Sequence, residues 1–327
     1  MSSLKSRRNF IFNLGALATA SVLPTRTLAK VFESPLYPPL DLSYFDTPIT
    51  PAPAAMRFGY AAITWNGNDV QAIKEISELG FRGIQLRSNL LKEYGDKPQA
   101  IKDLLQQHKL QFVALSGGGP RTGDSDADTI ATQVKNATFL HAAGGLYLQM
   151  TDSMRPKDGK PTAEDCKRLG RVLTEVGKRV TDMGVGLAYH NHMNTVGETP
   201  DEVDRIMDAA DARYVKLLLD VAHYKQGGGD PAKAIKQYGE RILFLHIKDV
   251  ESPVPASAGE AAKAAYRFVE LGRGKVDLPA VFAALKAIKF RGWAVVELDS
   301  VPDKTRTPKE AAMISKKFIE EKLKLSI

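Results

Sequence analysis

The chain has 327 residues, of which 43% are hydrophobic, so it can bury the core of one barrel-type domain or of two smaller domains. Its single cysteine, Cys166, excludes an internal disulfide framework and a metal site built on Cys-x-x-Cys. The net charge of +7 falls by four, to +3, without the first 29 residues, which carry Lys5, Arg7, Arg8 and Arg26 and no acid. A body of +3 with interspersed signs argues against a nucleic-acid partner.

The N-terminus is typical of an export signal. Arg7 and Arg8 precede a short apolar stretch, residues 10–23, and residues 27–29 form a small-x-small cleavage site. The apolar stretch is shorter than the ~20 residues of a stable membrane span. The paired arginines resemble the twin-arginine signal of bacteria, so we expect residues 1–29 to be a signal peptide and the protein to be periplasmic.

Residues 30–55 are rich in proline and show no periodicity. Proline at this density opposes a helix and a central strand. We therefore expect a linker, or an extended arm that lies on the domain that follows.

From Met56 to the C-terminus, short apolar runs alternate with longer amphipathic ones. Strands are predicted at 57–63, 82–87, 111–116, 145–150, 185–190, 214–220, 242–248 and 293–298. Helices are predicted at 68–79, 97–109, 127–143, 163–183, 200–210, 231–239, 277–289 and 308–324. Eight strands, each followed by a helix, predict a (β/α)8 TIM barrel over residues 56–327. An open doubly wound sheet is the alternative, but no Gly-x-Gly-x-x-Gly motif follows the first strand.

Polar residues gather where the last four predicted strands end, which is the face that carries the functional site in such a barrel. Four of the six histidines stand there, beside two acidic residues. Together they are His190, His192, Asp220, His223, His246 and Glu297. Each alone could be a rim or capping residue, but imidazoles and carboxylates without thiolates suit one divalent ion such as Zn²⁺, Mn²⁺, Co²⁺ or Fe²⁺.

Four stretches carry a resemblance to a known family: LLLDVAHY (217–224), RILFLHIKDV (241–250), ELGRGKVDLPAVFAAL (270–285) and GWAVVELD (292–299). They resemble the xylose-isomerase-like TIM-barrel family of sugar isomerases, epimerases and dehydratases, and in motif they are closest to its inosose dehydratase branch. The resemblance extends from about Met56 to the C-terminus. It implies an enzyme with one divalent metal ion, whose ligands after strands six, seven and eight correspond to Asp220, His246 and Glu297.

The chain departs from this family after the fifth strand. Epimerase members have Glu-Asn-His there, whereas this chain has His190-Asn191-His192. His190 therefore stands in the place of a ligand glutamate, and it could bind the metal or point away from it. Without two facing carboxylates a symmetric inversion is harder to run, whereas one base and one general acid suffice for α-deprotonation and loss of a β-oxygen.

These features predict a metal-dependent lyase that acts on a keto-sugar, keto-glycoside or keto-cyclitol by enolisation and β-elimination. Glu297 or His192 would be the base, and His223 or Lys248 the general acid. The first alternative is isomerisation or epimerisation of a ketose through the same enolate. The second is an exported sugar-binding barrel without catalysis. The sequence leaves the oligomeric state open.

Three further residues are predicted to bind substrate, and each has a structural alternative. Trp65 could stack on a sugar or pack at the rim, Glu198 could bind a hydroxyl or close a helix start, and Arg273 could meet an anionic group or be solvated. Lys248 could instead pair with Asp249. The segment from Glu251 to Gly274 is long enough for a lid.

Overall fold

The computed structural model describes residues 56–120, 124–156, 160–251 and 266–327. The predicted signal peptide, the proline-rich segment and most of the predicted lid lie outside these ranges. Their assignments therefore stay predictions.

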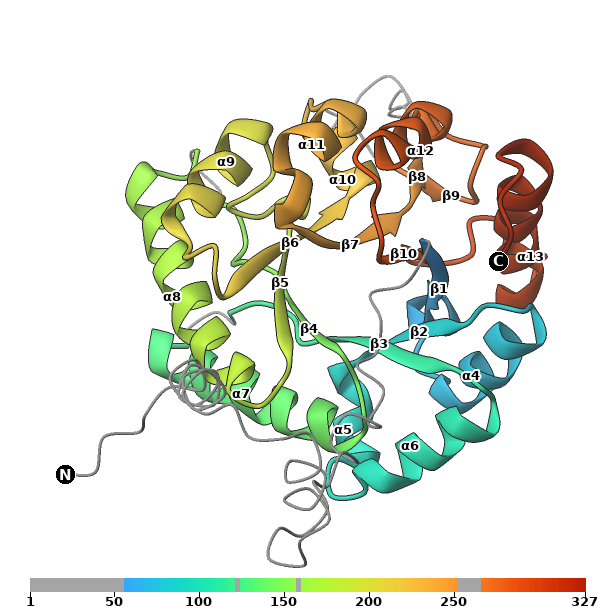
Figure 1. Ribbon diagram of the computed structural model, residues 1–327, viewed down its shortest axis with the longest axis horizontal. Coiled ribbons are helices and arrows are strands. Elements are labelled where there is room, and N and C mark those ends of the chain that lie inside the picture. Colours follow the sequence, from blue (N-terminus) through green and yellow to red (C-terminus); the bar gives the residue numbers. More distant parts are fainter. Residues whose placement is uncertain (1–55, 121–123, 157–159, 252–265) are drawn as a thin grey trace, which may run out of the picture. The chain divides into compact units, whose positions relative to one another are not determined.

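Eight parallel strands form a closed barrel in the order β1-β10-β7-β6-β5-β4-β3-β2. They are β1 (Arg57–Ala61), β2 (Gly83–Arg87), β3 (Gln111–Ser116), β4 (Tyr147–Met150), β5 (Gly186–His190), β6 (Val215–Asp220), β7 (Ile242–Ile247) and β10 (Trp293–Val296). Each lies within the range predicted for it, which confirms the TIM barrel and rules out the open sheet. Figure 1 looks into the ring of strands, with blue β1 next to β10 where the barrel closes.

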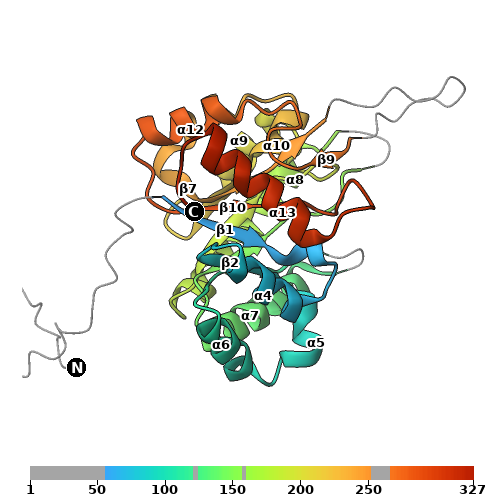
Figure 2. The same cartoon turned by 90° about the vertical axis from the view of Figure 1, so that its right-hand side faces the viewer.

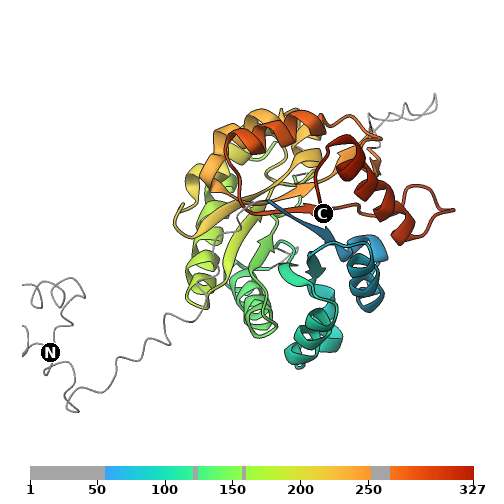
Figure 3. The same cartoon turned by 45° about the vertical axis from the view of Figure 1, so that its right-hand side comes forward.

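The helices cover the outside of this ring. The main ones are α4 (Asp69–Glu78), α6 (Pro98–Gln107), α7 (Asp126–Ala142), α8 (Ala163–Thr181), α9 (Pro200–Ala209), α11 (Pro231–Tyr238), α12 (Leu278–Ala287) and α13 (Pro308–Lys317). Figures 2 and 3 show that they stay outside the sheet when the molecule is turned. No helix in the described ranges is long and apolar enough to cross a membrane.

Short elements that were not predicted separately lie between the barrel strands and the main helices. They are η1 (Ala62–Trp65), η2 (Ser88–Leu90), α5 (Leu91–Tyr94), α10 (Val221–Gln226), η3 (Gly239–Arg241) and the hairpin of β8 (Asp249–Val250) with β9 (Phe268–Val269). The last predicted helix, 308–324, comprises α13 and the π-helical turn η4 (Phe318–Lys322) that continues it. The first predicted strand, 57–63, is two residues too long because the chain turns into η1 after Ala61. There Thr64 Oγ1 donates to Leu298 O at 2.6 Å and fixes this turn against the chain that follows β10.

An apolar layer fills the barrel interior and forms the floor of the site. Phe244 stacks on Tyr147 with ring centroids 5.5 Å apart, and its ring lies 6.0 Å from that of His246. Trp293 packs over Gly83, where a Cβ would come within 2.5 Å of the indole. Only glycine leaves room for that ring, so the close approach of β2 to β10 depends on Gly83.

Candidate metal centre

The candidate site is a cluster of buried side chains at the carboxyl ends of β5, β6, β7 and β10. β5 ends at His190 and β6 at Asp220, and His246 is the penultimate residue of β7. The parallel register pairs Asp220 with His246, so the two side chains lie on the same face of the sheet. Glu297 follows β10 directly, and its backbone N–H donates to Ile247 O at 3.1 Å. The sequence prediction that these residues converge is confirmed.

Three buried atoms at the centre of the cluster have no hydrogen-bond partner among the described residues: His190 Nε2, Asp220 Oδ2 and His246 Nδ1. Asp220 Oδ2 lies 3.5 Å from His190 Nε2 and 3.4 Å from His246 Nδ1, and the latter lies 3.4 Å from Glu297 Oε1. Buried polar atoms are normally paired, so this convergence indicates a missing partner. The donor set of carboxylates and imidazoles fits the predicted divalent cation.

Two overlapping triads have ligand atoms within 4.8 Å of one another. One is Asp220, His246 and Glu297, and the other is His190, Asp220 and His223. Asp220 belongs to both triads. The first triad is the set that the family resemblance implies.

Both acids of the first triad are held in the ionised state. Burial opposes ionisation of Asp220, but the interactions with the His223 ring and with the charged Lys248 outweigh it, and the pKa of Asp220 is well below its usual range. Its Oδ1 also accepts two backbone N–H groups at the start of α10, at 2.9 and 2.8 Å. Burial acts likewise on Glu297, and the interactions with the His246 ring and with the charged Lys248 lower its pKa.

Lys248 is a fully buried cation at the edge of the cluster. Its Nζ lies 2.6 Å from Asp299 Oδ1, 3.1 Å from Glu297 Oε1 and 4.0 Å from the centre of the Phe268 ring. Burial disfavours the charge, but the neighbouring carboxylates, Glu297 first, raise the pKa of Lys248 above its usual range. The alternative partner, Asp249, instead accepts three backbone N–H groups of the following loop at 2.9 to 3.0 Å.

Three further histidines surround the triad. Burial lowers the pKa of His190 to about 4 and that of His223 well below its usual range, so both rings are neutral at neutral pH. His192 is half-buried, and its ring lies 3.9 Å from that of His223. His192 Nδ1 is 2.8 Å from Met193 O and must carry a proton to donate to that carbonyl. A neutral His192 therefore has an unprotonated Nε2.

Two glutamines complete the site, and the sequence analysis gave them no role. His246 Nε2 lies 2.9 Å from Gln85 Oε1, Gln85 Nε2 donates to Gln149 Oε1 at 2.7 Å, and Gln149 Nε2 lies 2.7 Å from His190 Nδ1. Both amides are buried and come from β2 and β4. A polar residue within an otherwise apolar barrel strand is the signal that would have found them, because only the interior of the mouth could satisfy such a side chain.

Two of the predicted substrate residues make structural contacts. Trp65 is only 5% exposed, meets Tyr60 edge-to-face and donates its indole N–H to Glu75 Oε2 at 2.6 Å. These contacts support the rim-packing alternative. Glu198 lies 3.6 Å from Arg155. The helix start that Glu198 was expected to close is instead capped by Glu202, four residues further along the chain.

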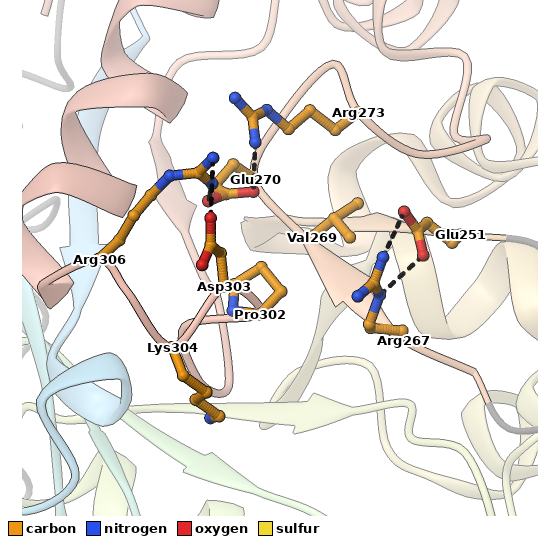
Figure 4. Close-up of a pocket in the computed structure, with 9 residues that line it drawn as sticks. All are labelled: Glu251, Arg267, Val269, Glu270, Arg273, Pro302, Asp303, Lys304 and Arg306. Atoms are coloured by element: carbon orange, nitrogen blue, oxygen red, sulfur yellow. Dashed lines mark hydrogen bonds and ion pairs between the residues drawn. The ribbon is translucent and has the colours of Figure 1, made fainter.

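Arg273, the third predicted substrate residue, lines a cavity of about 440 Å³ whose lining includes none of the cluster residues. Figure 4 shows that the arginines of this cavity are paired with its acids. Arg306 contacts Glu270 and Asp303 at 2.9 and 3.1 Å, and Arg273 faces Glu270 at 3.5 Å. A larger cavity of about 990 Å³ lies at the ends of β2 and β3, beside residues 116–119.

Comparison with known proteins places the chain in a family. The model of the xylose isomerase-like TIM barrel family matches residues 73–321, and the chain belongs to this family, as its motifs predicted. It is 31% identical over 276 residues to the rhizopine catabolism protein MocC of Rhizobium meliloti, covering 76% of this chain and 83% of MocC. It is 27% identical over 295 residues to an inosose dehydratase of Lacticaseibacillus casei, covering 81% and 96% of the two chains. The crystal structure of the IolI protein with a bound zinc atom matches with a TM-score of 0.67, at 23% identity, over 81% of this chain and 97% of IolI.

Proposed function

We propose that this protein is a divalent-metal-dependent lyase that removes water from a keto-cyclitol, keto-glycoside or keto-sugar. The observation that carries the proposal is the convergence of unpartnered buried atoms of Asp220 and His246, 3.4 Å apart, beside Glu297. The similarity to an inosose dehydratase supports a keto-cyclitol as the substrate class.

Asp220, His246 and Glu297 would hold the ion, and His190 lies where the family resemblance predicts a fourth ligand. When bound, the ion would supply Lewis acidity at a substrate carbonyl and so make the α-hydrogen easier to remove. The apolar floor around Phe244 keeps water from the barrel side of the site.

His192 is the base that the geometry favours. Its Nε2 is unprotonated when Nδ1 donates to Met193 O, and the ring is half-exposed, so substrate can reach it. Glu297 is the weaker candidate because the charge of Lys248, 3.1 Å away, makes its carboxylate a weaker base. A general base of this kind is worth about 10²–10⁴ in rate.

Lys248 is the proton donor that the geometry favours. Its charge is kept by Glu297 and Asp299, and its Nζ lies 3.3 Å from His223 Nε2. In the elimination the α-C–H bond breaks and its proton goes to His192. The electron pair forms the double bond, and the β-C–O bond breaks as the departing oxygen takes a proton from Lys248 or His223. The products are an enone and water.

The test is metal analysis of purified protein together with an ultraviolet assay for enone formation from inososes, 3-keto-glycosides and free ketoses. We expect one divalent ion per chain and enone from at least one of these substrates. Isomerised or epimerised ketose without enone would instead support the isomerase alternative. Binding of sugar without turnover or metal would support the non-catalytic barrel.

A further inference from the structure

A continuous row of four side chains crosses the barrel mouth from His246 through Gln85 and Gln149 to His190. Its three contacts are 2.7 to 2.9 Å long, and all four side chains are at most 3% exposed. Each contact needs one hydrogen and one lone pair. The row therefore has a direction, and the hydrogens at its two ends depend on each other.

The direction follows from the amides. His246 Nε2 meets an amide oxygen, so it donates and carries a proton. Gln85 donates to Gln149, and Gln149 then presents its NH₂ group to His190 Nδ1, which must accept. An imidazole always carries at least one proton, so a His190 ring that accepts at Nδ1 carries its proton on Nε2, the atom that faces Asp220 Oδ2 at 3.5 Å.

Turning both amides over reverses every contact and exchanges the roles of the two rings. His190 would then offer a lone pair at Nε2, and His246 would carry its proton on Nδ1. For both rings to offer lone pairs to the centre, the NH₂ groups of Gln85 and Gln149 would have to face each other. Two buried donors in contact leave both unsatisfied, which is costly where solvent is excluded.

We propose that Gln85 and Gln149 form an amide relay that fixes the two rings in opposite senses. In this relay His246 presents a lone pair to the metal position and His190 presents an N–H. This inference rests on the proposed function for the metal, and it deepens that function by assigning His190 as a hydrogen-bond donor rather than a fourth ligand. Gln85 and Gln149 are positioning residues, since they act on the centre only through the imidazoles.

The choice of His246 as the ligand follows from its neighbours. Its Nδ1 lies 3.4 Å from a carboxylate oxygen of Asp220 and from one of Glu297, which completes a three-residue donor set. The relay transmits this choice to His190. The N–H of His190 is then available to Asp220 or to a substrate oxygen, at the position where epimerases of the family carry a carboxylate.

The relay is tested by ¹⁵N NMR of the histidine rings in the full chain, both metal-free and zinc-loaded, because ring-nitrogen shifts and couplings distinguish the two tautomers. Single His→Gln variants at 108, 141, 190, 192, 223 and 246 assign the signals. We expect His190 to carry its proton on Nε2 in both states and His246 to carry one on Nε2. A proton on His190 Nδ1 in the wild-type protein overturns the proposal.

Gln149→Glu should remove the constraint that the amide relay places on His190. A carboxylate at this position accepts from Gln85 and also from His190 Nδ1, so the His190 proton should move to Nδ1 and Nε2 should become a ligand. Zinc should then bind about 10–100-fold more tightly, as measured by competition with a chromophoric chelator. This range is the effect on metal affinity of a group that orients a ligand, and a ligand itself should contribute at least as much. Gln85→Glu should have the same two effects because it reverses Gln149.

Gln133→Glu is the matched control for these variants. Gln133 is also a buried glutamine, but it donates to the carbonyls of Gly117 and Gly118 on the far side of the glycine-rich loop. This variant should leave the His190 tautomer unchanged. An unmoved His190 proton in both Gln149→Glu and Gln85→Glu contradicts the relay. Normal tautomers with no enone from any substrate contradict the proposed function and leave the relay standing.

Discussion

The two halves of the barrel mouth differ in charge. The half formed by β5, β6, β7 and β10 carries the ionised side chains of Asp220, Lys248 and Glu297. The half formed by β2, β3 and β4 carries the neutral amides Gln85 and Gln149 and a glycine-rich loop beside the larger cavity. The difference separates two tasks, since the charged half can hold a cation and move protons while the neutral half orients the ligands.

Asp152 and Asp220 show how finely the environment sets this division. Both are buried; Asp152 lies just after β4, and Asp220 is the last residue of β6. Burial raises the pKa of Asp152 to about 7, since its hydrogen bonds from Tyr189 and Gly197 offset the loss of solvent only in part. The charged Lys248 and the imidazoles around Asp220 reverse the outcome for the same side chain. Burial alone therefore does not decide which acid binds a metal.

Removing the centre of the charged half should have the largest effect. Asp220→Ala takes away the carboxylate shared by both triads, so bound metal and enone formation should both be lost. Metal content by mass spectrometry and the ultraviolet assay measure the two quantities. His141→Ala, on the exposed surface of α7, is the control and should change neither. Wild-type metal content in Asp220→Ala would disprove the proposed ligand set.

Removing the base should separate catalysis from metal binding. His192→Gln should lower kcat by about 10²–10⁴ while metal content stays at the wild-type level, because His192 touches the reacting atoms and is not a ligand in the proposed set. Steady-state kinetics on the best substrate and metal analysis of the same sample provide the two numbers. If kcat is unchanged, Glu297 is the base instead.

Asp152 should make stability depend on pH in the sense opposite to a salt-bridged acid. Between pH about 4 and 7 the folded state keeps this proton while the unfolded chain loses it, so folding binds the proton and stability falls as pH rises through this window. Comparing the free energy of unfolding of wild type and Asp152→Asn, which cannot ionise, isolates the effect. Parallel pH curves for the two proteins would show that Asp152 titrates normally.

Trp65 should have the smallest effect. Trp65→Phe removes the indole hydrogen bond to Glu75, so the free energy of unfolding should fall by about 0.5–1.5 kcal/mol while kcat and KM stay unchanged. Chemical denaturation and steady-state kinetics measure these quantities. A raised KM with unaltered stability would restore the stacking role that the sequence suggested.

Much of this division was visible in the sequence. The alternation of short apolar runs with amphipathic ones predicted all eight strands, because a parallel strand that is buried on both faces is a nearly continuous run of apolar residues. The histidines and acids of the charged half were found by their position at strand ends. The neutral half was not, because a glutamine such as Gln149 acquires its role only from a partner that lies 41 residues away in the chain.

The local turns at the strand ends could not be predicted from the sequence either. Trp65 is the last residue of the 3-10 turn η1. Its indole contacts Glu75 of α4, the helix that follows this turn. Lys248 adjoins Asp249 in sequence, yet it lies between β7 and β8 and pairs with Glu297 and Asp299, which follow β10.

One measurement tests the central claim most directly, that the charged half performs a one-sided elimination. The metal-loaded protein is incubated with an accepted inosose or keto-glycoside in deuterated water, and product and recovered substrate are analysed by NMR. With one base on one face of the substrate, the account predicts enone as the product and recovered substrate of unchanged configuration. Epimerised substrate that carries deuterium at the α-carbon, without enone, would contradict it.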